Sequence, residues 1–129
     1  MKFTDLQTRV FTAGEALAAY RLVILSNNNE VVLADEGDDT IIGSTGIDGA
    51  VADGADVNVR LWNASGTRRL TAGGAITAGA AVAVAANGKV VALTDETKAY
   101  GQALEAAAAD GDVIEVLPLG PLYAMPTGS

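Results

Sequence analysis

The chain has 129 residues and a mass of 13.0 kDa, the size of one ordinary domain, so we expect a single globular unit. Hydrophobic residues make up 50% of the chain, yet only 5% of residues are aromatic and 25 are alanine. A core built from such small side chains is thin, which favours burial against a partner subunit.

Charge and missing residue types exclude several classes of function. Eight Lys and Arg against sixteen Asp and Glu give a net charge of −8, which phosphate backbones repel, so no nucleic-acid partner is expected. The chain has no Cys and no His, which removes thiolates, disulfides, the commonest general base and the commonest metal ligand. We therefore expect no enzyme, no cofactor and no metal centre.

Residues 1–12 are interpreted as an N-terminal arm. They lack the apolar run of a secretory signal, and no stretch of the chain is long and apolar enough to span a membrane, so we expect a soluble protein without a membrane partner. Phe3, Leu6, Val10 and Phe11 supply the apolar side chains of this arm. Such residues dock on a neighbour in many proteins, although partly exposed apolar residues are also common.

Period-two apolar runs separated by turn residues dominate from Arg21 onward, and they predict three hairpins. In the first, RLVIL and EVVLA flank SNNN at residues 26–29. In the second, DVNVRLW and TRRLT flank NASG at residues 63–66. In the third, AAVAVAA and KVVALT flank Asn87-Gly88, a dipeptide suited to a type I′ turn because both positions accept a positive φ.

Two segments have an ambiguous pattern. ALEAAAAD at residues 103–110 has the highest helix propensity in the chain, but Gly101 and Gly111 leave room for little more than about two helical turns. We expect a strand over residues 98–104, followed by at most a short helix. EALAAYRL at residues 15–22 is ambiguous in the same way.

One phrase occurs three times, as ADGADVNV at residues 52–59, TAGAAVAV at 77–84 and ADGDVIEV at 109–116. In each copy a glycine precedes alternating apolar residues, which is typical of a turn that leads into a strand. Gly43 and Gly101 also precede two of the copies at nearly the same spacing. We therefore predict two related β units inside one domain, although such common residues also recur by chance.

The predicted fold class is mainly β: a compact small β-barrel or β-sandwich-like domain over residues 13–119, with short helical segments and extended terminal arms. Residues 120–129 are predicted to be a C-terminal tail. All three prolines of the chain lie from residue 118 onward, which disfavours a central strand there.

Polar clusters in the sequence have ordinary structural interpretations. The acidic run at residues 35–39 lacks the spacing of a calcium loop and is expected to be a solvated turn. The aspartates of the repeated turns, such as Asp112, are expected to accept hydrogen bonds from local backbone N–H groups. GSTG at residues 43–46 lacks the lysine of a phosphate-binding loop, so Ser44 is expected to lie in a turn.

Trp62 and three arginines are the candidate interface residues. Strand alternation places Arg60 and Trp62 on the polar face of DVNVRLW. There Trp62 either anchors an interface or covers the edge of the core. Arg68 and Arg69 are expected near that face, where they either pair with carboxylates of a neighbouring subunit or remain solvated.

The order of Gly-centred turns and Val-rich strands resembles the capsid cement or head-decoration proteins of tailed phages. The resemblance spans residues 17–119 and rests on AYRLVIL, IIGSTGIDGAVADGADVNVRL, GGAITAGAAVAVAANGKVVAL and YGQALEAAAADGDVIEVLPL. It implies homotrimers on the outer capsid surface of the virion, made in the host cytoplasm. It also implies that the major capsid protein is the partner and that the expanded shell is stabilised against internal DNA pressure.

Attachment is expected to use the N-terminal arm. Strand addition would place the main chain of residues 1–12 against a capsid edge, with Phe3, Leu6, Val10 and Phe11 as the candidate capsid-binding residues.

Two other functions remain open at this point. A carbohydrate- or receptor-binding β module of a virion would need an exposed aromatic platform around Tyr20, Trp62 or Tyr100. A small β-barrel enzyme acting through aspartates such as Asp53 or Asp110 is the third possibility.

Overall fold

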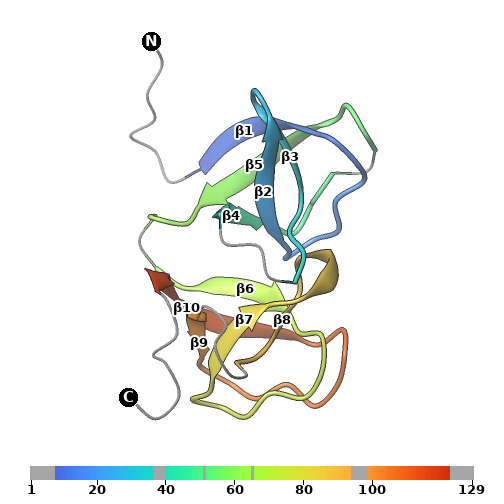
Figure 1. The fold of residues 1–129 in the computed structure, drawn as a ribbon. Helices are drawn as coiled ribbons and strands as arrows, with labels where there is room; N and C mark the ends of the chain where they lie inside the picture. Colours follow the sequence, from blue (N-terminus) through green and yellow to red (C-terminus); the bar gives the residue numbers. More distant parts are fainter. Residues whose placement is uncertain (1–7, 37–39, 51, 65, 94–98, 123–129) are drawn as a thin grey trace.

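The computed structural model describes residues 8–36, 40–50, 52–64, 66–93 and 99–122. Its strands form two units, which lie one above the other in Figure 1. The N-terminal unit contains β1 (Thr8–Ala13), β2 (Leu22–Asn27), β3 (Glu30–Leu33), β4 (Ile41–Thr45) and β5 (Asp56–Leu61). The C-terminal unit contains β6 (Arg68–Thr71), β7 (Ala81–Val84), the 3₁₀ turn η1 (Ala86–Gly88), β8 (Val90–Ala92), β9 (Ala99–Ala103) and β10 (Val113–Leu122).

The N-terminal unit is a closed barrel with the strand order β1-β3-β2-β4-β5. It closes through β1, which is antiparallel to β5 and parallel to β3. Alternation along β1 buries Phe11 and Ala13 inside the barrel and leaves Val10 outside. Closure leaves β1 without an unpaired edge for another chain to join.

The C-terminal unit has the strand order β6-β10-β9-β7-β8. Its two outer strands meet at a parallel bridge between Ala72 and Val90, next to a 2.8 Å hydrogen bond from the N–H of Gly73 to the carbonyl of Val90. The pairing partners therefore follow the same order as in the N-terminal unit, with β6 to β10 taking the places of β1 to β5.

The same interior positions are apolar in both units. Leu17 and Ala50 exchange two backbone hydrogen bonds of 2.8 Å, and Ile76 and Ala107 exchange two of 2.9 Å. In the N-terminal unit the interior residues are Phe11, Ala13, Leu17, Val23, Val31, Ala50, Val57 and Val59. In the C-terminal unit they are Leu70, Ala72, Ile76, Val82, Val90, Ala107, Ile114 and Val116. The predicted pair of related β units is confirmed.

The repeated phrase marks turns in which glycine has a positive φ. Gly54 (+88°) and Gly111 (+96°) occupy equivalent turns before β5 and β10, and Gly79 (+89°) lies in the turn before β7. The copy at residues 77–84 therefore corresponds to residues 18–25 of the N-terminal unit and not to the other two copies. In that turn of the N-terminal unit Tyr20 stands in the place of Gly79 and has a φ of 58°, a conformation that costs a non-glycine residue about 1–2 kcal/mol.

Two of the three predicted hairpins are confirmed. β2 pairs with β3, and β7 pairs with β8 around a turn in which Asn87 and Gly88 have φ values of 62° and 72°. The prediction of the second hairpin was wrong, because β5 pairs with β1 and β4 whereas β6 pairs with β10. The intervening residues 62–67 connect the two units. Local turn residues could not reveal that the chain leaves the N-terminal barrel and begins the C-terminal unit there.

The ambiguous segments form no helix in the described part of the chain. β9 confirms the strand expected over residues 98–104, except that residue 98 lies outside the described residues. Leu17 and Ala107 instead form isolated bridges within their units. Within the described ranges, no helix has the length and hydropathy needed to cross a membrane.

Both ends of the domain differ from the expected boundaries. Residues 8–12 are part of β1, and β10 continues to Leu122, with an irregular register after Pro118. Residues 1–7 and 123–129 lie outside the described residues.

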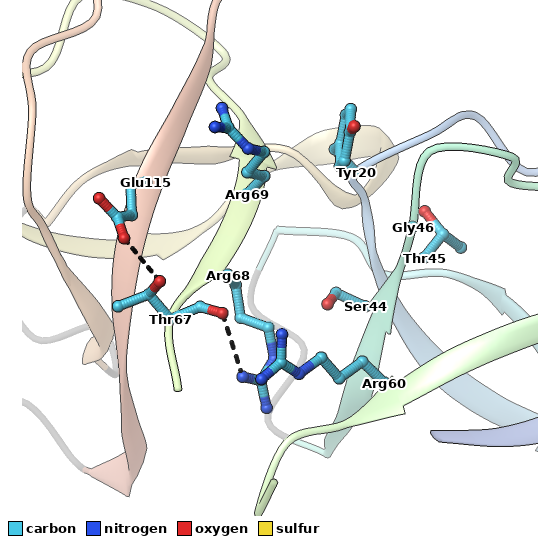
Figure 2. Close-up of a pocket in the computed structure, with 9 residues that line it drawn as sticks. All are labelled: Tyr20, Ser44, Thr45, Gly46, Arg60, Thr67, Arg68, Arg69 and Glu115. Atoms are coloured by element: carbon cyan, nitrogen blue, oxygen red, sulfur yellow. Dashed lines mark hydrogen bonds between the residues drawn. The ribbon is translucent and has the colours of Figure 1, made fainter. Parts of the chain in front are cut away.

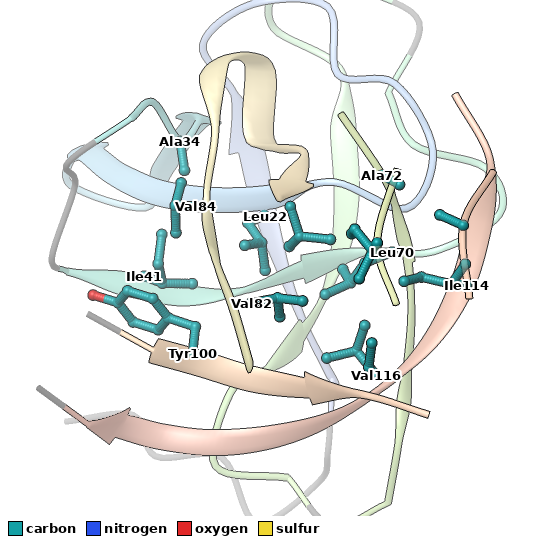
Figure 3. Close-up of a cluster of buried hydrophobic side chains, with 14 of the residues drawn as sticks. Leu22, Ala34, Ile41, Leu70, Ala72, Val82, Val84, Tyr100, Ile114 and Val116 are labelled. Carbon is teal, nitrogen blue, oxygen red and sulfur yellow. The ribbon is translucent and has the colours of Figure 1, made fainter. Parts of the chain in front are cut away.

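A shared apolar cluster joins the two units (Figure 3). Leu22 and Ile41, on the outside of the N-terminal barrel, pack with Val84 and Tyr100 of the C-terminal unit. Backbone hydrogen bonds reinforce this contact, including a 2.7 Å bond from the N–H of Gly88 to the carbonyl of Ala34. The units are therefore packed as one body, and their interface is part of the core.

Gly43 and Gly101 are required by close strand packing in the two units. A β-carbon at Gly43 would lie 2.3 Å from the carbonyl oxygen of Arg60, and one at Gly101 would lie 2.8 Å from that of Leu117. We expect Gly43→Ala and Gly101→Ala each to lower the free energy of unfolding by about 1–3 kcal/mol, because backbone must move. Urea unfolding followed by circular dichroism measures this effect.

Gly74→Ala is the matched control, since a β-carbon there meets nothing within 4 Å. It should leave stability unchanged or slightly raised. Equal stability of the Gly43→Ala and Gly74→Ala variants would contradict the proposed close approach.

Candidate functional site: a basic pocket between the two units

A pocket of about 450 Å³ lies where the two units meet (Figure 2). The N-terminal unit contributes the turn before β2, the end of β4 and the outer face of β5, and the C-terminal unit contributes β6 and β10. The lining residues are Tyr20, Ser44, Thr45, Gly46, Arg60, Thr67, Arg68, Arg69 and Glu115. Three of the eight basic residues of a chain with a net charge of −8 thus line one pocket.

Arg68 forms the buried wall of this pocket and is only 3% exposed. Its guanidinium donates hydrogen bonds to the carbonyl oxygens of Leu61 (2.6 Å), Gly66 (3.1 Å) and Ala64 (3.2 Å), and it lies 5.4 Å from the centre of the Trp62 ring. Arg68 therefore holds the segment that connects the two units.

Burial, and secondly the charge of Arg60, lower the pKa of Arg68 to about 10. The guanidinium still carries its charge at neutral pH. Its Nε is buried without a hydrogen-bond partner in the described structure, so this cation has given up more water than its hydrogen bonds replace.

Arg60 and Arg69 bring positive charge to the pocket from different units. Arg60 extends from β5 toward Arg68 (Figure 2). Its guanidinium also lies close to Gly66, because a β-carbon built at Gly66 would be 2.7 Å from a terminal nitrogen of Arg60. Arg69 is exposed on β6, opposite Glu115 of β10. Glu115 is the one carboxylate of the lining, and it accepts a 2.6 Å hydrogen bond from the hydroxyl of Thr67.

The strained turn of Tyr20 faces the pocket and is fixed from several sides. The hydroxyl of Thr45 donates to the carbonyl of Ala18 (2.8 Å) and accepts from the N–H of Arg21 (2.9 Å). The carbonyl of Tyr20 accepts a 2.9 Å hydrogen bond from the N–H of Thr71 in β6. The left-handed residue is thus held directly at the junction of the two units.

The structure separates the four candidate interface residues into two pairs. Trp62 is 8% exposed, makes an edge-to-face contact with Tyr100 at 6.5 Å, and donates from Nε1 to the carbonyl of Leu119 at 2.9 Å. Trp62 and Arg68 therefore join the two units of one chain. This position agrees with the interpretation that Trp62 covers the edge of the core. Arg60 and Arg69 remain accessible at the pocket.

The candidate capsid-binding residues are also divided. Phe11 is 3% exposed and belongs to the core of the N-terminal barrel, whereas Val10 points outward and is 53% exposed. Phe3 and Leu6 lie outside the described residues. Because residues 8–12 pair with β5, they already have strand partners within the chain.

Sequence reasoning missed most of the other pocket residues. Ser44 was expected in a turn, but it is buried within β4. The positive φ of Tyr20 could have been predicted from the sequence, because aligning the two units places Tyr20 at the position of Gly79. Asp112 does cap its turn as expected, since its carboxylate accepts hydrogen bonds from the N–H groups of Ala108 (2.8 Å) and Ala109 (3.1 Å).

The outer face of β10 has apolar residues on both sides of Glu115, at two positions where the equivalent face of β5 is polar. Val113 and Leu117 stand in the places of Asp56 and Arg60, and they are 38% and 39% exposed. Leu104 extends this apolar face, because its N–H bonds to the carbonyl of Glu115 and its side chain is also exposed. We call Leu104, Val113 and Leu117 the β10 patch.

These sites have the chemistry of a binding protein. The pocket offers cations and hydroxyl groups, and the β10 patch offers exposed apolar side chains. Within the described ranges, no group of three or more acidic side chains could hold a metal ion. Trp62 and Tyr100 are both buried, so they form no exposed aromatic platform for a sugar.

The described strands define a mainly β protein built from a doubled unit, and the comparisons with known proteins specify its family. The family model described as phage cement protein matches residues 3–118. The chain therefore belongs to the phage cement protein family and is a structural protein of a phage capsid.

Comparison with solved structures agrees with this assignment at the level of the fold. The chain is similar to the head fiber gp8.5 N base of bacteriophage phi29, with a TM-score of 0.70 and 20% sequence identity. The similarity covers 92% of this chain and 97% of that chain. No curated protein sequence matches this chain significantly.

Proposed function

We propose that this protein binds the outer surface of an expanded phage capsid as a homotrimer, contacts the major capsid protein and stabilises the shell. The observation that carries the proposal is the match to the cement protein family over residues 3–118. A protein that stabilises a shell needs binding surfaces and a rigid body. The apolar junction that packs the two units together supports this proposal.

Capsid attachment is assigned to the residues that precede β1, together with Val10 beside them. Residues 8–12 cannot leave β1 without opening the barrel, because they pair with β5 from Thr8 to Thr12. Phe11 is excluded from the proposed contact, since its side chain fills the barrel interior. Phe3 and Leu6 remain in the proposed contact.

Subunit contacts of the trimer are assigned to the β10 patch. Val113 and Leu117 are exposed apolar side chains of β10 at positions where β5 has Asp56 and Arg60, and the exposed Leu104 follows β9. Burying such side chains against another copy contributes hydrophobic stabilisation that a polar face lacks. Trp62 and Arg68 take no part in this contact, because both are buried inside the chain.

Co-sedimentation with expanded capsid shells tests the proposal. The full chain should bind saturably, and removal of residues 1–7 should weaken binding about tenfold or more because the arm contacts are lost. This truncation keeps β1 intact. Binding of both proteins with equal affinity would move attachment elsewhere, and binding by neither would contradict the cement function.

A Leu117→Asp variant tests the trimer in a separate experiment. It should lower the mass measured by light scattering from that of a trimer toward that of a monomer, because a charge would be buried at the contact. Asn58→Asp, at an exposed position of the polar β5 face, is the matched control. A trimer that survives Leu117→Asp would show that the β10 patch is not the subunit contact.

A further inference from the structure

We propose that the basic pocket between the two units is a carboxylate-binding site, which receives the side chain of a Glu or Asp from a neighbouring protein chain. The proposed binding of a carboxylate depends only on the pocket of this chain and does not depend on the proposed capsid function. The identity of the neighbouring chain rests on the proposed function.

Electrostatics favour an anion in this pocket. Arg60, Arg68 and Arg69 line one cavity, and Arg60 and Arg68 are close enough for the charge of one to lower the pKa of the other. The terminal nitrogens of Arg68 donate hydrogen bonds to carbonyl oxygens, which do not neutralise its charge. Like charges held together in a partly desolvated site are stabilised by an opposite charge from outside.

The lining favours a singly charged group over a phosphate. Glu115 is held on the pocket wall by its 2.6 Å hydrogen bond to Thr67, and its negative charge opposes a second charge on the ligand. A carboxylate brings one charge and a planar pair of oxygens, which fits the fork of a guanidinium. The cavity of about 450 Å³ also has room for the stem of a side chain beside the Tyr20 ring.

The backbone strain at Tyr20 is an independent observation that supports a binding role for this pocket. The position of Tyr20 in the duplicated fold is occupied by Gly79 in the C-terminal unit, where the same positive φ carries no penalty. In the N-terminal unit the strained tyrosine lines the pocket. Strain of this kind is commonly kept where a side chain contacts a ligand.

Nuclear magnetic resonance titration of the isolated full chain tests carboxylate binding. The probe is acetyl-Glu-amide, and the uncharged control is acetyl-Gln-amide. We expect saturable shifts of the backbone amides of Tyr20, Ser44, Gly46 and Arg69 with the first probe only. Shifts that are absent, or equal for both probes, would overturn the proposal, as would tighter binding of inorganic phosphate at the same amides.

Variants of the exposed arginine separate a pocket effect from a general charge effect. Arg69→Gln should weaken binding of acetyl-Glu-amide about tenfold through loss of one charge-assisted hydrogen bond, and Arg69→Lys should weaken it less. Arg9→Gln removes the same charge from β1, outside the pocket lining, and should leave binding unchanged. Equal weakening by Arg69→Gln and Arg9→Gln would contradict a specific site.

The source of the carboxylate is tested by competition. Saturating acetyl-Glu-amide should either release the protein from capsid shells, which assigns the carboxylate to the shell, or lower the oligomer mass, which assigns it to a second copy. If neither happens, the assignment to a neighbouring protein chain is wrong even if the free probe binds. Failure of shell binding by the untreated protein would contradict the cement function and leave the titration result standing.

Discussion

Replacing Trp62 with alanine is expected to lower the free energy of unfolding by about 3–5 kcal/mol, as for other buried aromatic residues. The ring lies between the two units, where it contacts Tyr100 and stacks under the Arg68 guanidinium. The truncation leaves a cavity in the junction and removes the hydrogen bond to Leu119. The substitution should therefore destabilise the contact between the two units more than it destabilises either unit itself.

Urea unfolding followed by far-ultraviolet circular dichroism measures this effect, since Trp62 is also the one tryptophan of the chain and its fluorescence would be lost. We expect the unfolding of Trp62→Ala to broaden or separate into two transitions, one for each unit. Trp62→Phe should cost less because most of the ring remains, and Val10→Ala at an exposed position should cost little. A loss below about 1 kcal/mol for Trp62→Ala would show that the junction does not depend on this ring.

Replacing Arg68 with methionine is the second large expected change, with a loss of about 2–4 kcal/mol in the free energy of unfolding. Methionine preserves much of the aliphatic volume but cannot donate to the carbonyl oxygens of Leu61, Ala64 and Gly66. Leu61 is the last residue of β5, and Ala64 and Gly66 lie in the connection between the units. Without their donor, we expect that connection to lose its fixed conformation.

Arg69→Met is the matched control for Arg68→Met, since the two arginines are adjacent in β6 but Arg69 is exposed. It should change stability by less than about 0.5 kcal/mol. Arg68→Lys should lie between the two, because a lysine keeps the charge but lacks the planar fork of donors. Equal losses for Arg68→Met and Arg69→Met in the same urea experiment would contradict the structural role of Arg68.

Alternation and turn residues were sufficient to predict most of the strands. The runs around residues 26–29 and Asn87-Gly88 became hairpins because strand pairing across a short loop is a local property. The same reasoning failed at residues 63–66, where the flanking strands β5 and β6 found partners distant in sequence. A short polar connection has the same local sequence pattern whether it joins the two strands of a hairpin or links two separate units.

The candidate site was only partly predictable, for a similar reason. Arg60, Arg68 and Arg69 could be selected from the sequence as charged residues near an expected strand face. Their convergence with Tyr20 and Ser44 depends on the contact between the two units, which brings β4 and β5 beside β6. The burial of Phe11 likewise depends on the pairing of β1 with β5, which no local pattern specifies.

Local sequence patterns were enough to predict a mainly β protein made of two related units, because glycine turns and alternating apolar positions are local features and occur in both units. The sequence also defines a chain without His or Cys and with a strong negative charge. The burial of Trp62 and Arg68 between the units, and the convergence of three arginines on one pocket, could not be predicted in this way. Both depend on how the outer faces of the two units pack, and packing between distant segments leaves no local signal in the chain.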